Sequence, residues 1–315
     1  ARTFEQLYVL RALMGISEAA YIPAALALIA DYHRTGTRSL AVGIHTTGFY
    51  IGQAFGGFGA TIAAVSSWQL TFQFFGLTGI VYSLVLMMAL REKKSHRPVA
   101  GKQSAGTDFV QAVRGVVMLL GNLSFWVMLF YFSAPSVPGW ATKSWLPTLF
   151  SETLHLPMEE AGPLATITLA AASFVGVLAG GALSDRWVRS NLKGRIYTSV
   201  IGLTLTLPSL FFLGYGTSAP HILAGALCFG LGFGMFDANN MPILCQFVPP
   251  RYRATGYGLM NMAGVAAGAF ITNFLGKSID AGHLGRDFAL LSTVVVVAAV
   301  LQLTILKPQT ANKED

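Results

Sequence analysis

The sequence has little charge. Only 11% of its 315 residues are charged, whereas a soluble domain carries about 25% charged residues. A soluble protein with so few charges could not cover its surface with polar side chains, and 53% of this chain is hydrophobic. Together with a mean hydropathy of +0.57, this composition excludes an ordinary soluble domain and favours a protein embedded in a lipid bilayer.

The sequence also has few cysteines and no metal-binding or catalytic motif. Cys228 and Cys245 fall in one apolar segment, where a helix would hold them about 25 Å apart, too far for a disulfide. The six histidines are scattered without metal-ligand spacing. No phosphate-binding loop or nucleophile elbow is present. We therefore predict no metal, no cofactor and no enzymatic activity.

The net charge of +7 does not indicate a nucleic-acid partner. Most of the 21 Lys and Arg residues lie in short segments between long apolar runs, which is the pattern of membrane topology. The basic segments 31–38, 91–121, 185–195 and 248–253 and the C-terminal tail alternate with segments that have few basic residues. We therefore predict a multi-pass protein of the cell (inner) membrane with a cytoplasmic C-terminus.

Nine stretches have about the 20 apolar residues that a membrane-spanning helix needs. Since no segment alternates in polarity as barrel strands do, we expect an all-α membrane protein. The predicted domains are a helical bundle over 1–90, a cytoplasmic linker with an interfacial helix over 91–121, a six-helix bundle over 122–306 and a tail over 307–315. The nine predicted spans are 5–30, 39–64, 68–90, 122–149, 161–183, 196–216, 220–247, 254–279 and 287–306.

The first and seventh predicted spans share one pattern, Gly-x-x-acid-Ala-x-x-x-Pro. Gly15, Glu18 and Pro23 recur as Gly234, Asp237 and Pro242 at identical spacing. Parallel repeats of this kind build transporters with two halves. Since the repeat pairs spans 1–3 with spans 7–9, spans 4–6 lack partners. We therefore expect nine of twelve helices in two bundles, with three N-terminal helices missing.

Three motifs resemble those of the major facilitator superfamily from its fourth helix onward. They are an R-x-x-x-G motif from Arg11 to Gly15, a G-x-x-x-D-R-x-x-R loop at 181–189 in which Val188 replaces the usual Gly, and the segment 253–258. The resemblance implies a monomeric, gradient-driven transporter of a small polar solute that works by alternating access, with H⁺ or Na⁺ as the coupling ion.

Two further segments bear on the type of solute. The Gly-rich stretch 48–57 is similar to a motif of drug antiporters, but Gln53 replaces its proline. The segment 138–147 is similar to the seventh helix of organic-anion and sugar-acid symporters. We expect a proton-coupled carrier of an organic anion or sugar acid. A multidrug efflux antiporter and a non-transporting membrane sensor remain alternatives.

Charged residues at membrane depth are costly and indicate function or pairing. Four stand out: Arg11, Glu18, Lys143 and Asp237. Arg11 and Glu18 lie two helical turns apart, so they either form an ion pair or have a functional role. The resemblance places Glu18 and Asp237 opposite each other in a central cavity. Either carboxylate is then a candidate carrier of a coupling proton.

Other candidate residues are polar or lie beside these charges. Lys143 with Trp140 either binds an anionic substrate or reaches the outer interface. The amides of Asn239 and Asn240 either bind substrate or join neighbouring helices. Weaker substrate-binding candidates are His45, Gln53 and Asn261. The resemblance implies that Asp185, Arg186 and Arg189 close the cytoplasmic side, whereas a plain cluster of inside positive charges is the alternative.

Overall fold

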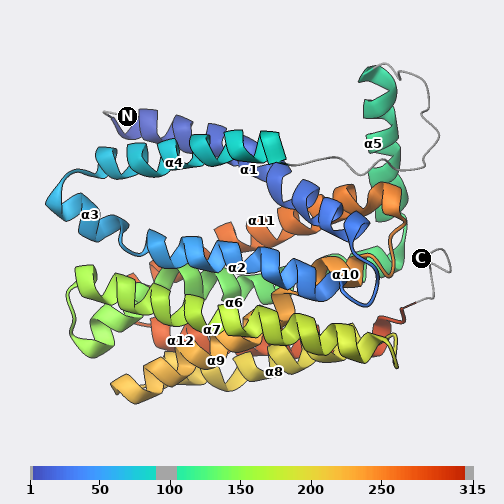
Figure 1. Cartoon of the computed structure of the whole chain (residues 1–315). Helices are drawn as coiled ribbons and strands as arrows, with labels where there is room; N and C mark the ends of the chain where they lie inside the picture. Colours follow the sequence, from blue (N-terminus) through green and yellow to red (C-terminus); the bar gives the residue numbers. More distant parts are fainter. Residues whose placement is uncertain (1–2, 90–104, 309–315) are drawn as a thin grey trace.

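The computed structural model describes residues 3–89 and 105–308, and these form helices without any strand (Figure 1). Long helices run along a common direction, with α1 and α4 side by side above the others in the view of Figure 1. The elements are α1 (Phe4–Tyr32), α2 (Arg38–Gly56), α3 (Gly59–Val65), α4 (Trp68–Ala89), α5 (Ala105–Leu120), α6 (Leu123–Leu154), α7 (Met158–Val188), α8 (Gly194–Tyr215), α9 (Ala219–Asp237), α10 (Asn240–Leu244), the 3₁₀ turn η1 (Pro250–Tyr252), α11 (Arg253–Asp280) and α12 (Leu284–Ile305).

A helix lies over each of the nine predicted spans, but fewer than nine have the length and apolar composition of a membrane-crossing helix. In the described residues seven helices do, or eight if α5 and α6 count as one bent span. The predicted span 39–64 is interrupted at Gly57–Phe58, between α2 and α3. Arg38, His45 and Gln53 lower the hydropathy of α2, which buries one face and exposes apolar side chains such as Ile44 and Phe55 on the other.

The interfacial helix predicted before the second bundle corresponds to α5. It meets α6 at 90° and stands across the direction of the long helices in Figure 1. The chain turns at Asn122, whose side chain accepts a hydrogen bond of 2.9 Å from the amide of Ser124. This bond satisfies one of the free N–H groups at the start of α6. Residues 90–104, the first part of the predicted linker, lie outside the described residues.

The main core lies among α6 to α12, where aromatic and aliphatic side chains such as Phe150, Phe229 and Phe288 are fully buried. Glycines permit close helix packing here. A Cβ at Gly234 on α9 would lie 2.5 Å from the carbonyl oxygen of Ser173 on α7. By contrast, α1 and α4 expose large apolar side chains such as Leu13 and Met88, a surface suited to lipid or to further helices.

One helix of the first part of the chain packs closely on the second part. A Cβ at Gly43 on α2 would lie 2.6 Å from the carbonyl oxygen of Val177 on α7, and one at Gly181 on α7 would lie 2.7 Å from the carbonyl oxygen of Ser39. Small residues at such crossings let two helix backbones approach. The α2–α7 pair therefore forms the closest junction between residues 3–89 and 105–308.

Candidate functional site

A cavity of about 230 Å³ lies between α1, α2, α6, α9 and α11. Its walls combine aromatic rings with a few polar groups. Lys143 and Asp237 are the two charged residues among the described residues that line it. The aromatic lining residues are Phe49, Tyr50, Phe132, Trp140, Phe233 and Tyr257, and the other polar ones are Thr46, Gln53, Ser136 and Asn261.

The ammonium of Lys143 lies over two aromatic rings of the cavity wall. Its nitrogen is 5.8 Å from the ring centroid of Trp140 and 5.6 Å from that of Phe233. Cations are attracted to ring faces at this range. In the described part of the chain no ion pair joins Lys143 to a carboxylate. The cavity therefore presents a cation that packs against aromatic rings and makes no direct ion pair in the described residues.

Each of these two rings rests on a glycine of a neighbouring helix. A Cβ at Gly139 on α6 would lie 2.6 Å from Cζ of Phe233 on α9. A Cβ at Gly268 on α11 would meet the ring of Trp140 on α6. A side chain at either position would push the ring away. Gly139 and Gly268 therefore allow the rings of Phe233 and Trp140 to lie close to Lys143.

Asp237 at the end of α9 is held by hydrogen bonds from both parts of the chain. The hydroxyl of Tyr50 on α2 donates to Oδ2 over 3.1 Å, and Nδ2 of Asn240 donates to Oδ1 over 3.2 Å. The Tyr131 hydroxyl donates to Oδ1 of Asn240 over 3.2 Å and lies 2.9 Å from Oγ of Ser199. A polar chain thus leads from the cavity into the interior of the second bundle.

Local chemistry explains why α9 ends at Asp237. Pro242 has no N–H to donate to the carbonyl four residues before it. The side chain of Asn239 donates to the carbonyl oxygen of Met235 over 2.8 Å, a local bond that competes with helix propagation. The turn between α9 and α10 places Asp237 at the cavity and keeps Asn239 and Asn240 buried behind it.

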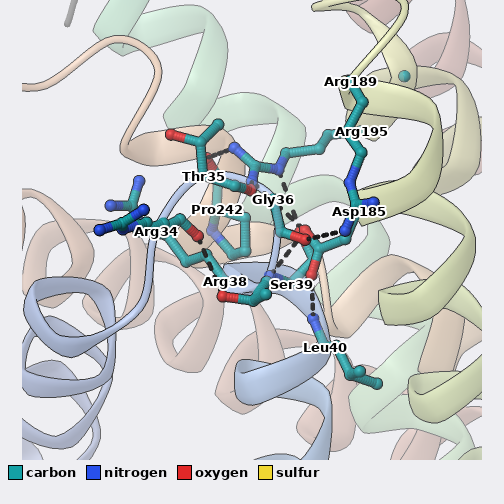
Figure 2. Close-up of polar contacts among 12 residues, drawn as sticks. Arg34, Thr35, Gly36, Arg38, Ser39, Leu40, Asp185, Arg189, Arg195 and Pro242 are labelled. Carbon is teal, nitrogen blue, oxygen red and sulfur yellow. Dashed lines mark hydrogen bonds and ion pairs between the residues drawn. The ribbon is translucent and has the colours of Figure 1, made fainter. Parts of the chain in front are cut away.

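A second polar cluster lies at the predicted cytoplasmic end (Figure 2). It contains Ser39, Asp185, Arg189 and Arg195, and we call it the latch. The Asp185 carboxylate of α7 accepts hydrogen bonds from the backbone N–H groups of Ser39 over 3.1 Å and Leu40 over 2.8 Å. These are free N–H groups in the first turn of α2, whose N-cap residue Thr37 makes no side-chain capping bond. A carboxylate there also matches the positive end of the helix dipole.

Two arginines of the second bundle complete the latch. The fully buried Arg195 bonds to Oγ of Ser39 over 3.1 Å and to the carbonyl oxygen of Thr35, and lies 3.5 Å from the Asp185 carboxylate. Arg189 donates to the carbonyl oxygen of Gly36 over 3.3 Å. Figure 2 shows these side chains meeting around the turn between α1 and α2. The latch therefore joins α7 and α8 to α2.

The structure brings five of the predicted residues together in the cavity: Gln53, Trp140, Lys143, Asp237 and Asn261. Asn240 is outside the cavity lining and donates a hydrogen bond to Asp237, whereas the Asn239 side chain donates to the carbonyl oxygen of Met235 on α9. His45 is outside the cavity lining, and its ring lies tilted against that of Tyr21 and edge-on to that of Phe49. Of the predicted cytoplasmic residues, Asp185 and Arg189 lie in the latch, and the side chain of Arg186 is exposed outside it.

The structure does not bring Arg11 and Glu18 to the cavity. Arg11 belongs to α1, and its side chain lines pockets that lie between α1 and α4. Glu18 is exposed on α1, and no ion pair joins the two in the described part of the chain. Their two-turn spacing places them on one face of α1, but the cavity is lined by Ile22 and Leu26, which lie farther along the helix.

Tyr50 and Arg195 belong to these sites although no sequence pattern singled them out. Tyr50 lies in the Gly-rich stretch 48–57, where only the glycines and Gln53 matched a family motif, and nothing in its neighbourhood singles out its hydroxyl. Arg195 belongs to a basic segment that was interpreted through membrane topology. The short spacing from Asp185 to Arg195 at one helix–helix turn was the available signal, since opposite charges at such a turn can pair.

Comparisons with known proteins agree with this architecture. The sequence model of the Major Facilitator Superfamily matches residues 1–272. A bacterial homologue of the human lysosomal transporter Spinster, solved in an inward-facing and unoccupied conformation, aligns with a TM-score of 0.62 and 20% identity. The alignment covers 96% of this chain and 78% of that one. At this identity the similarity concerns the fold.

Curated relatives include transporters of different anions. The chain is 23% identical to "Probable anion transporter 4, chloroplastic" of Oryza sativa subsp. japonica over 94% of its own length and 51% of the relative's. It is 25% identical to the chloroplastic ascorbate transporter of Arabidopsis thaliana over 94% and 56%. It is 29% identical to the 4-hydroxybenzoate transporter PcaK of Pseudomonas putida over 96% and 71%.

The chain thus spans about half the length of the first of these relatives. Its helical fold, its membrane-spanning segments and the family match lead to one assignment. The chain belongs to the major facilitator superfamily, as a multi-pass, all-helical membrane protein of a transporter family and not an enzyme.

Proposed function

We propose that the complete protein is a proton-coupled, gradient-driven transporter of a small organic anion that works by alternating access. The observation that carries this proposal is the Lys143 ammonium, which faces the cavity over two aromatic rings and makes no direct ion pair in the described residues. In a site with little water such a cation attracts an anion more strongly than it would in bulk solvent. The anion-transporting relatives support the same solute class.

Asp237 is the residue that we assign to the coupling proton. It is the acidic residue of the described cavity lining, and acids inside membrane bundles commonly act as proton relays. Its two partners, Tyr50 and Asn240, both donate to it, so the ionised form is satisfied in this conformation. Protonation of Asp237 would weaken the hydrogen bond that it accepts from Tyr50, which joins α2 to α9. Proton binding would thereby loosen one contact between the two parts of the chain.

The latch supplies the gate that alternating access needs. It joins the two parts of the chain at the predicted cytoplasmic end through Asp185, Arg189 and Arg195. All of these bonds cross between α2, or the turn before it, and α7 or α8. Opening the cavity to this end requires breaking them together, so they stabilise the arrangement in which this end is closed.

Uptake measurements on the complete protein in proteoliposomes test the proposal. We expect saturable uptake of at least one organic anion, which an inward proton gradient accelerates and Lys143→Gln abolishes. Lys277→Gln is the matched control, because Lys277 is an exposed lysine on α11 outside the cavity lining. Anion binding without any uptake would indicate a sensor, and uptake of organic cations that is unaffected by Lys143→Gln would indicate a multidrug carrier.

A further inference from the structure

The charge balance of the cavity limits which anion it can carry. We propose that the cavity takes an organic monoanion with a flat apolar body together with one proton, so that a transport cycle moves no net charge. This inference rests on the proposed function and adds the valence of the substrate, its shape and the proton stoichiometry. It concerns Lys143, Asp237 and the aromatic residues of the same cavity.

The described lining of the empty cavity is electrically neutral when Asp237 is ionised, because Lys143 supplies one positive charge and Asp237 one negative charge. A monoanion beside Lys143 adds a negative charge, and one proton bound by the Asp237 carboxylate removes it. Both the empty and the loaded cavity are then neutral. A dianion with one proton leaves a net negative charge, and an uncompensated charge in a site of low polarity is costly.

The groups around Asp237 offer no further charge to neutralise a dianion. From α2 it meets the hydroxyl of Tyr50, and from α10 the amide of Asn240. Lys143 from α6 and Tyr257 from α11 line the same cavity and interact with it electrostatically. In the described residues, α1 adds Ile22 and Leu26 to the lining. Lys143 is thus the one cation of the described lining.

The shape of the cavity favours a flat apolar body between the two charged residues. Lys143 lies over Phe233, which precedes Asp237 by four residues on α9, a separation of roughly 6 Å along the helix. This length suits one six-membered ring with its substituents. Trp140, Phe132 and Tyr257 add aromatic surface to the lining, and such surface gains by packing against a flat apolar ligand but gains nothing from a small hydrated anion such as phosphate.

Binding to the complete protein in detergent tests the valence and the shape. Isothermal calorimetry at neutral pH compares benzoate, its dianionic analogue terephthalate, and inorganic phosphate. We expect benzoate to bind at least about tenfold more tightly than terephthalate, which carries two charges, or phosphate, which has no flat apolar body, a difference of about 1.4 kcal/mol. Asn261→Lys, which adds a second positive charge to the described lining, should narrow the affinity gap between benzoate and terephthalate. Asn261→Ala, at an uncharged lining residue, should leave that gap unchanged.

Electrical measurements test the stoichiometry. Benzenesulfonate is a flat monoanion that stays ionised, so it does not cross the bilayer as a neutral acid. In proteoliposomes clamped with potassium and valinomycin, we expect its initial uptake rate to rise with an inward proton gradient and to be the same at either sign of the membrane potential. An uptake rate that follows the potential would overturn the proposed electroneutral cycle.

The outcomes separate this inference from the proposed function. If phosphate or terephthalate binds as tightly as benzoate and Lys143→Gln abolishes that binding, anion transport stands and selection of a monoanion is wrong. If none of the anions binds and the complete protein transports none, the proposed function itself fails. If benzoate binds best but Asn261→Lys leaves the affinity gap between benzoate and terephthalate unchanged, the charge balance is not the source of the selectivity.

Discussion

The Asp185 carboxylate of α7 accepts hydrogen bonds from the backbone N–H of Leu40 over 2.8 Å and of Ser39 over 3.1 Å. An acid from the second bundle therefore caps a helix of the first. The cap of α2 does not come from the residue that precedes the helix, since Thr37 makes no side-chain capping bond. Separating the bundles at this end removes the cap, so the stability of α2 depends on the conformation of the whole protein.

Asp185→Asn should favour conformations that are open at the latch end. Hydrogen bonds to a charged group contribute about 1.5–3 kcal/mol, so we expect the closed state to lose roughly tenfold in population. The measurement is the rate at which an impermeant maleimide labels Val42→Cys, a buried cavity position on α2, in protein without Cys228 and Cys245. Arg186→Gln is the control, and an equal increase with that variant would contradict a specific role for Asp185.

Asp237→Asn should abolish the pH dependence of uptake while expression stays normal, because the coupling proton then has no carboxylate to bind. Uptake by the unchanged protein should fall as the outside pH rises, since fewer protons are available to load Asp237. Glu18→Gln is the matched control, because Glu18 is exposed on α1 and lies outside the cavity lining. The assignment is wrong if Glu18→Gln, and not Asp237→Asn, removes the pH dependence.

Gly139→Ala should weaken anion binding without touching Lys143. The added methyl group would lie 2.6 Å from Cζ of Phe233, so the ring must move from beneath the ammonium. Losing one cation–π contact of about 1 kcal/mol corresponds to roughly fivefold weaker binding, measurable by calorimetry.

Gly276→Ala on α11 serves as the control for Gly139→Ala. The carbon added at Gly276 would lie 3.4 Å from the Trp145 ring, a much less crowded contact than the 2.6 Å at Gly139. Overpacking by Gly139→Ala should also lower the melting temperature. Equal anion affinity for both variants would contradict the role of the ring.

Cysteine labelling tests the predicted orientation of the membrane helices. Arg114 on α5 and Lys193 before α8 belong to basic segments that we predict on the cytoplasmic side. Arg114→Cys and Lys193→Cys should react with an impermeant reagent in inside-out vesicles and not in intact cells. The prediction for α5 is wrong if Arg114→Cys reacts from the outside while Lys193→Cys does not.

The sequence by itself determined the class of this protein. Low charge and long apolar runs specify an all-helical membrane protein, because lipid offers the backbone no hydrogen-bond partners. Motifs of a few residues identified the superfamily. The charged residues at membrane depth, Lys143 and Asp237, were also recognisable as candidates, since burying a charge in a bilayer is costly without a role for it.

Only the tertiary structure decided which of the candidates share a site. Glu18 and Asp237 occupy equal positions in the sequence repeat, yet Asp237 lines the cavity and Glu18 does not. The glycines of the repeat differ in the same way, because a Cβ at Gly15 would meet no other described helix within 4 Å whereas one at Gly234 would lie 2.5 Å from the carbonyl oxygen of Ser173 on α7. Which way a helical face points depends on the helices packed around it, and a pattern within one helix carries no information about those neighbours. For the same reason the roles of Tyr50 and Arg195 follow from hydrogen bonds to Asp237 and Ser39, which lie 187 and 156 residues away in the chain.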